Sequence, residues 1–314
     1  MTLRRNFLAS ALSSAVAPLL LPASFDALAA PALPDATGPY QLPNTFVHPL
    51  PDPVTGRAYE VWVDLPTGAK PQDGPLPAVF VTDAPYAFPL VRSLRNRVGQ
   101  AGHNIADFVL VGLAGPASES AVAMRSRDYT PTNPLARADK PKNLYGASQY
   151  GEGARYLRYV AELAVPAISA RYNIDAKRRV ILGHSYGALF AAQALLERPD
   201  LFSHHILGSP SLWFDQHAIL EREAAYARAH RDLDARIFQY VGEFEAVRPG
   251  ERYNKENDLV ADMWRFQKTL QRRGYRSLKI ESHVLAGNDH LTVAPAGATL
   301  GLLWALPGRG PYSG

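Results

Sequence analysis

The 314-residue sequence predicts an α/β fold with a mostly parallel central sheet, an antiparallel hairpin at its N-terminal side and helices on both faces. Two observations predict this fold. Short apolar runs alternate with amphipathic helical patterns along most of the chain, which is the order that builds βαβ units. Before them, two strand-like segments flank the turn-forming sequence PDPVTG at residues 51–56, as in a hairpin. In such a sheet, reactive side chains lie on loops at the carboxyl ends of the strands.

The individual elements follow in order from these patterns. Strands are expected at residues 46–50, 58–65, 77–82, 108–113, 179–182, 205–208, 237–241 and 278–285. Helices are expected at residues 89–100, 153–170, 188–197, 215–230, 257–273 and 295–305. The connection at residues 114–152 is too long for a plain turn, so we expect it to line a site. No internal repeat or linker divides residues 46–308, which are therefore expected to form a single domain.

Composition excludes several classes of function. The net charge of +4 is small and dispersed, so we expect no nucleic-acid partner. The chain has no cysteine, which excludes thiol catalysis, cysteine-ligated zinc, iron–sulfur clusters and disulfides. The content of 47% hydrophobic and 20% charged residues is that of a globular protein with a sizeable core.

Residues 1–29 have the pattern of a cleavable export signal. Arg4 and Arg5 precede an apolar stretch from Phe7 to Leu21, and Ala27-Leu28-Ala29 forms a small-residue cleavage site. The sequence RRNFL at residues 4–8 resembles a twin-arginine signal, with an ordinary secretory signal as the alternative.

Both export routes end outside the cytoplasm. We therefore expect transfer by the export machinery, a mature chain that starts near Ala30, and a periplasmic or secreted location. A Pro-rich lead follows at residues 30–45. The apolar stretch of the signal is too short and interrupted for a membrane span, and no second stretch of about 18 apolar residues follows.

The strongest chemical signal is the sequence GHSYG at residues 183–187. It places G-x-S-x-G between an expected strand and an expected helix, which is the context of a nucleophile elbow. The sharp turn has no room for a Cβ at Gly183 or Gly187, and the N-terminus of the following helix stabilises negative charge. The pattern therefore predicts Ser185 as a nucleophile.

A serine hydroxyl needs an adjacent base, and in this arrangement a carboxylate and a histidine follow the serine in chain order. Of the later histidines, His290 alone lies in a polar loop directly after the last expected strand. His290 is therefore the predicted base. The adjacent His204 and His205 border a buried strand and lack carboxylates at ligand spacing, so we predict no metal site.

The acid is expected after the strand at residues 237–241. Glu245 is the first candidate and Glu243 is the alternative, because both follow the end of that strand closely.

Several segments resemble an esterase family of α/β-hydrolases that contains enterobactin-type siderophore esterases and relatives of S-formylglutathione hydrolase. The resemblance rests on GHSYGALFAAQALLERPDLF at residues 183–202 and on SPSLWF at residues 209–214, a block typical of the siderophore esterases. TDAPYAF at residues 82–88, RDYTPT at 127–132 and GEGARYLRYVAELAVPAISARYNI at 151–174 agree with it.

This resemblance extends over residues 40–305 and implies an α/β-hydrolase fold with no cofactor. It also implies hydrolysis of a small-molecule ester through Ser185 and His290. Similar periplasmic proteins cleave trilactone catecholate siderophores to release iron, so a ferric siderophore is a candidate substrate. Other carboxylic esters, including aryl or feruloyl esters, remain an alternative. A non-hydrolytic binding protein on the same fold is a further alternative, which the intact elbow and His290 argue against.

The sequence departs from the family pattern at the oxyanion hole. Where the family usually supplies an amide after the third strand, this chain has Pro85, which lacks an N–H group. The amide of Tyr186 is expected to be one donor, and that of Ala84 or Tyr86 the second. The acid also varies within the family, so a serine–histidine pair is the alternative to a triad.

Charged and aromatic residues of the long connection and of the SPSLWF block are candidates for substrate binding. Arg125 and Arg127 would balance the charge of a ferric catecholate, and the alternative for both is an internal ion pair. The candidates for an aromatic wall are Tyr129, Tyr145, Trp213 and Phe214, and the alternative for Trp213 is a place in the core.

Overall fold

The computed structural model describes residues 38–68, 74–139, 144 and 146–311. The predicted export signal, most of the Pro-rich lead and Tyr145 lie outside the described residues. The chain divides into two units, Met1–Gln41 and Leu42–Gly314, and every element below belongs to the second unit.

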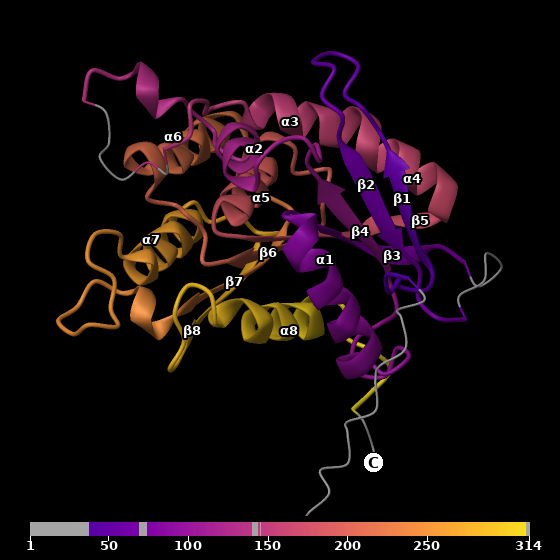
Figure 1. Cartoon of the computed structure of the whole chain (residues 1–314). Helices are drawn as coiled ribbons and strands as arrows, with labels where there is room; N and C mark the ends of the chain where they lie inside the picture. The colour runs from indigo at the N-terminus through magenta and orange to yellow at the C-terminus, as the bar shows by residue number, and fades with distance from the viewer. Residues whose placement is uncertain (1–37, 69–73, 140–143, 145, 312–314) are drawn as a thin grey trace, which may run out of the picture. The chain divides into compact units, whose positions relative to one another are not determined.

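The centre of the second unit is an eight-stranded sheet in the order β1-β2-β4-β3-β5-β6-β7-β8 (Figure 1). Strand β2 pairs antiparallel with both β1 and β4, and every other pair is parallel. The sheet is therefore mostly parallel with an antiparallel N-terminal hairpin, as predicted. The strands are β1 (Thr45–Pro49), β2 (Glu60–Asp64), β3 (Leu76–Val81), β4 (Val109–Ala114), β5 (Ile174–His184), β6 (His204–Gly208), β7 (Arg236–Gly242) and β8 (Lys279–Leu285).

Helices cover both faces of the sheet (Figure 1). They are α1 (Ala84–Ser93), α2 (Ala121–Asp128), α3 (Gly153–Tyr159), α4 (Val165–Tyr172), α5 (Tyr186–Glu197), α6 (Phe214–Ala229), α7 (Leu259–Arg272) and α8 (Val293–Ala305). Single π-helical turns, Leu94–Val98 and Val160–Ala164, extend α1 and join α3 to α4. Within the described ranges, no helix has the length and apolar character needed to cross a membrane.

Two hydrophobic clusters separate the faces, because successive side chains of a strand point to opposite sides. Phe80 and Ile181 pack with the face covered by α3 to α6. Val81 and Leu182, one position further along, pack with the face covered by α1 and α8. The inner strands β3 and β5 are thus buried on both sides, as expected for a sheet between two helix layers.

The sheet order places a topological switch at β3, since β4 lies on one side of β3 and β5 on the other. Ligands of open α/β sheets bind at the carboxyl ends of the strands next to such a switch. The helix α1 leaves β3 and the helix α5 leaves β5 at this point. The expected elbow therefore lies at the position that the topology favours for a site.

The largest differences from the sequence predictions lie at helices α1 and α2. Helix α1 starts at Ala84 rather than at residue 89, with Pro85 in its first turn, where the missing N–H is tolerated. Helix α2 was not predicted within residues 114–152. Its apolar pattern is weak, and Ser120 caps its N-terminus: the Ser120 side chain accepts a hydrogen bond from the amide of Ala123 at 3.2 Å.

Candidate active site

Ser185 lies at the turn between β5 and α5 with φ 59° and ψ −120°. This conformation is rare for a residue with a side chain, and it persists because the surroundings fix it. A Cβ on Gly183 would collide with the backbone of Gly187, and one on Gly187 would collide with the Thr82 side chain. The amide of Ser185 donates to the Gly208 carbonyl at 2.8 Å, which holds the turn against β6.

Glu245 and His290 form a hydrogen-bonded pair next to this turn. The Nδ1 of His290 lies 2.6 Å from the Oε1 of Glu245. The other carboxylate oxygen of Glu245 accepts bonds from the Ser209 hydroxyl and the Gly242 amide, each at 2.6 Å. Every oxygen of this buried carboxylate therefore has a partner, and the carboxylate orients the imidazole.

The environment keeps Glu245 ionised. Burial alone would raise the pKa of its carboxyl group. The hydrogen bonds from His290, Ser209 and the Gly242 amide outweigh burial, so the pKa lies below its usual value. The carboxylate is therefore available to stabilise a positive charge on His290 near neutral pH.

Glu243, the alternative candidate for the acid, makes its hydrogen bonds to other groups than His290. One of its oxygens accepts a hydrogen bond from the Gly287 amide at 2.8 Å, and the other accepts one from the Tyr253 hydroxyl at 3.3 Å. These bonds hold the loop that carries His290, and no hydrogen bond joins Glu243 to His290 in the described part of the chain.

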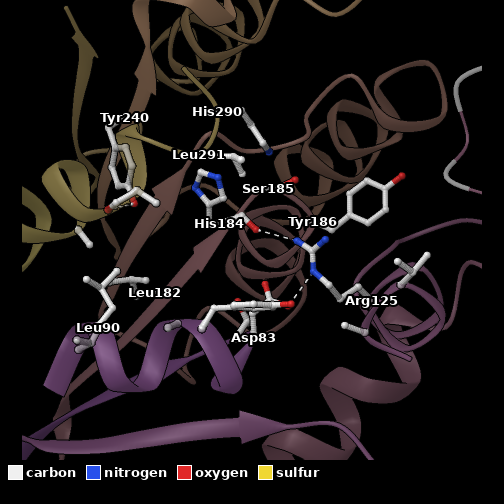
Figure 2. Close-up of a pocket in the computed structure, with 18 of the residues that line it drawn as sticks. Asp83, Leu90, Arg125, Leu182, His184, Ser185, Tyr186, Tyr240, His290 and Leu291 are labelled. Atoms are coloured by element: carbon white, nitrogen blue, oxygen red, sulfur yellow. Dashed lines mark hydrogen bonds and ion pairs between the residues drawn. The ribbon is translucent and has the colours of Figure 1, made fainter. Parts of the chain in front are cut away.

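Ser185 and His290 line the same cavity, and Figure 2 shows a ring nitrogen of His290 facing the Ser185 hydroxyl. The cavity has a volume of about 620 Å³. It is bounded by α1, α2, the elbow, β7 and the start of α8. The lining residues are Thr82, Asp83, Tyr86, Ala87, Leu90, Val91, Ala121, Val122, Arg125, Ser126, Leu182, His184, Ser185, Tyr186, Tyr240, His290, Leu291, Ala294 and Ala298.

Two serines of the SPSLWF block belong to the site, although the sequence did not mark them as functional. Ser209 bonds Glu245, as described above, and has φ 40°. The Ser211 hydroxyl lies 3.3 Å from the Ser185 hydroxyl, and the Ser211 amide donates to the Ser185 carbonyl at 3.3 Å. The resemblance had pointed to this block, but only the fold brings it against the acid and the nucleophile.

His184 is a second imidazole in the cavity. Its ring centroid lies 4.7 Å from that of His290. Burial, and then the neighbouring His290, lowers the pKa of His184 to about 4. His184 is therefore uncharged near neutral pH and does not compete with His290 as a base there.

The three candidate oxyanion donors differ in how the structure uses them. Tyr186 is the first residue of α5 and lines the cavity next to Ser185. In the first turn of α1, the Tyr86 amide donates to the Asp83 carbonyl at 2.9 Å, so Tyr86 is not available as the second donor. Ala84, the first residue of α1, is the remaining candidate in that turn.

Of the predicted substrate-binding residues that the structure describes, only Arg125 lines the cavity. Its Nε lies 2.7 Å from the Oδ1 of Asp83, and its Nη2 donates to the His184 carbonyl at 3.4 Å (Figure 2). Arg127 does not line the cavity, because its guanidinium is buried in ion pairs with Asp128 and Glu119. The alternative of an internal ion pair is therefore correct for Arg127.

Tyr129 and Trp213 also lie outside the cavity lining. Tyr129 is fully buried, and its hydroxyl accepts a hydrogen bond from the Asp83 amide at 3.1 Å. Trp213 packs near Tyr186, with ring centroids 6.3 Å apart, and against the cluster that contains Met263. Both side chains support the loops around the cavity instead of forming its wall.

Within the part of the chain that the structure describes, no group of three or more His, Asp or Glu side chains could hold a metal ion. The adjacent His204 and His205 are packing residues. His204 lies edge-on to Trp304 and His205 edge-on to Phe202.

Comparison with known proteins identifies the family of this chain. The model of the esterase family, described as "Putative esterase", matches residues 53–289. The chain belongs to this family. It is a carboxylic ester hydrolase.

Curated relatives of this esterase include two bacterial proteins. This chain is 27% identical over 281 residues to the Ferri-bacillibactin esterase BesA of Bacillus subtilis, and the aligned region covers 87% of this chain and 93% of the relative. This chain is 28% identical over 177 residues to the Apo-salmochelin esterase of Escherichia coli, and the aligned region covers 55% of this chain and 54% of the relative.

Solved structures show the same fold. The BES protein from Bacillus cereus matches with a TM-score of 0.72 and 21% identity, over 87% of this chain and 99% of the other. The siderophore hydrolase EstB from Aspergillus nidulans matches with a TM-score of 0.70 and 22% identity, over 87% and 98%. The α/β-hydrolase fold predicted from the sequence is confirmed.

Proposed function

We propose that this esterase hydrolyses siderophore esters, with Ser185 as nucleophile, His290 as general base and acid, and Glu245 as the orienting carboxylate. The observation that carries the proposal is the Glu245–His290 hydrogen bond of 2.6 Å beside the strained Ser185, in one cavity. A strained serine elbow, a histidine and a buried ionised carboxylate are the parts that acyl transfer to water requires.

In the first half of the reaction, His290 takes the proton of the Ser185 hydroxyl while the oxygen attacks the ester carbonyl carbon. The negative charge moves to the carbonyl oxygen, where the amides of Tyr186 and Ala84 are the proposed donors. The tetrahedral intermediate collapses, and His290 gives its proton to the leaving alkoxide. An alcohol leaves, and the acyl group remains on Ser185.

In the second half, His290 takes a proton from water, and the hydroxide attacks the acyl carbonyl carbon. The bond to Ser185 breaks, Ser185 regains its proton from His290, and the carboxylic acid leaves. Glu245 keeps its negative charge throughout and stabilises the imidazolium in both halves. Water and ester are consumed in equal amounts, and no cofactor enters the balance.

The siderophore assignment is supported by the relatives and by the site's shape. The Bacillus and Escherichia relatives are named for the hydrolysis of siderophores. The cavity of about 620 Å³ lies within the range of pockets that hold drug-sized molecules. Residues 1–29 have the pattern of an export signal, which fits an enzyme that works outside the cytoplasm. We propose that the enzyme is periplasmic or secreted.

Aryl or feruloyl carboxylic esters are the second candidate substrates. The observation that favours them is the largely apolar lining from α1, α2 and α8, which would accept a single aromatic acyl group as well as part of a larger trilactone.

A substrate panel on purified mature protein tests the assignment. The panel contains an iron-free enterobactin-type trilactone, methyl ferulate and p-nitrophenyl esters of several lengths, with products followed by chromatography. We expect kcat/KM for the trilactone to exceed that for the simple esters by about 100-fold or more. A higher kcat/KM for methyl ferulate would favour the second candidate and contradict the siderophore assignment.

A further inference from the structure

The charges that line the cavity cancel. Apart from the histidines, Asp83 and Arg125 are the charged side chains among the described lining residues. They face each other at 2.7 Å, and Arg125 is also held by the His184 carbonyl. His184 adds no charge, since it is neutral near neutral pH. The cavity therefore offers an incoming substrate no net positive charge.

The rim of the cavity is apolar. Tyr86 on α1, Val122 on α2 and Leu291 before α8 line the cavity, yet they are 71%, 51% and 78% exposed. Three large apolar side chains from three separate elements thus surround one opening. Such a grouping at a cavity mouth is typical of a surface that binds an apolar partner.

Two arginines near the site in the described part of the chain, Arg127 and Arg252, are engaged in other contacts. Arg127 is buried in ion pairs with Asp128 and Glu119. Arg252 follows the acid-bearing loop, but its guanidinium lies 3.7 Å from the centre of the Phe244 ring and donates to the Gly287 carbonyl at 3.5 Å. Neither arginine lines the cavity.

The two forms of a catechol siderophore differ in charge. Without iron, the catechol arms are largely protonated near neutral pH and present uncharged aromatic surface. With Fe³⁺, the coordinating catechol oxygens have lost their protons, and their negative charges outnumber the charge of the iron. A polyanion that enters an apolar cavity without a compensating cation loses solvation and gains no partner.

We propose that this esterase acts on the iron-free, uncharged ester in preference to its ferric complex. The inference rests on the proposed function and adds the form of the substrate. The relatives do not decide it, because one is named for a ferric siderophore and the other for an iron-free one. The inference rests on the Asp83–Arg125 ion pair, which carries no net charge, and on the apolar rim of the cavity in this chain.

The direct test compares kcat/KM for the iron-free trilactone and for its ferric and gallium complexes, with the full mature protein. Gallium gives a complex of the same charge without redox activity. We expect the iron-free form to be preferred by about tenfold or more. An equal or higher value for the ferric and gallium complexes would overturn the inference and leave the proposed function standing. Failure to cleave any form would overturn both.

Two opposite charge changes in the cavity sharpen the test. Asp83→Asn frees the charge of Arg125, and asparagine tolerates the φ of 54° at this position. This variant should move the preference toward the ferric complex by about threefold to tenfold. Arg125→Gln leaves Asp83 uncompensated and should move the preference further toward the iron-free form.

The matched control is Asp234→Asn. Asp234 is exposed and precedes β7, at the amino ends of the parallel strands and away from the carboxyl ends where the site lies. It therefore changes the net charge as Asp83→Asn does, without changing the cavity. Circular dichroism establishes that each variant is folded. If both cavity variants keep the wild-type ratio, or if the control shifts it as much, the ion pair does not set the preference and the inference is wrong.

Discussion

The two sides of the cavity are built on different principles. On the triad side, Ser185 and His290 line the cavity, and Glu245 and Ser209 lie behind His290. This side is held by hydrogen bonds that use both oxygens of the Glu245 carboxylate. The helix side, formed by the cavity-lining residues of α1 and α2, is largely apolar and carries one ion pair, between Arg125 of α2 and Asp83 just before α1. In the function that we propose, the reaction and the choice of substrate are therefore set by separate parts of the fold.

The largest expected effect comes from removing the nucleophile or the base on the triad side. Ser185→Ala and His290→Ala should each lower kcat by about 10³-fold or more, and the double variant should be little worse, because the two groups act as a unit. Steady-state kinetics on a trilactone or a p-nitrophenyl ester measures this. Activity of Ser185→Ala within tenfold of the wild type would contradict the assignment.

Glu245 and Glu243 provide a matched pair on the same loop. Glu245→Gln removes the charge that stabilises the imidazolium and should lower kcat by about 10²-fold to 10⁴-fold. Glu243→Gln changes a carboxylate that holds the Gly287 amide and should cost about tenfold or less. If neither variant loses more than tenfold, the enzyme works with a serine–histidine pair and the acid role of Glu245 is wrong.

On the helix side, the expected effect is smaller and falls on binding. Tyr86→Ser removes an exposed aromatic ring from the rim, so KM for an aromatic ester should rise by about threefold to tenfold while kcat changes little. The control is Val54→Ser, an equally exposed apolar residue in the N-terminal hairpin. A loss in kcat with an unchanged KM would show that the helix side takes part in the chemistry.

His184 lies between the two sides and yields the smallest expected effect. Its pKa of about 4, lowered by burial, leaves it deprotonated above about pH 5, so it contributes no ionisation between pH 5.5 and pH 8. The acid limb of the kcat/KM profile should therefore keep its midpoint in His184→Phe. A shift of that midpoint by more than about 0.5 pH unit would show that His184 titrates in the active range.

The positions of the three triad candidates could be predicted from the sequence because each of them closely follows a strand. The strand–turn–helix context marked Ser185, and the polar loops after the last two strands marked Glu245 and His290. The order of the parallel strands then brings these three loops together. The choice between Glu245 and Glu243 needed the structure, since only the hydrogen bonds distinguish two carboxylates on one turn.

The helix side could not be predicted, because it depends on contacts between segments far apart in the chain. Arg125 and Arg127 are alike in sequence, but α2 directs one into the cavity and buries the other against Asp128 and Glu119. Tyr129 was expected in the aromatic wall and instead lies beneath the Asp83 amide. Helix α2 itself was not predicted, because its apolar pattern is weak and its position depends on its N-terminal cap and its packing.

The central claim, that Ser185 is the nucleophile of a triad with His290 and Glu245, is tested most directly by covalent labelling with a fluorophosphonate. Peptide mass spectrometry after labelling should find the phosphonyl group on Ser185 alone, with labelling abolished in Ser185→Ala and slowed in Glu245→Gln. Ser211, whose hydroxyl lies 3.3 Å away, is the internal comparison. A label on Ser211 or on another serine, with Ser185 unmodified, would contradict the account.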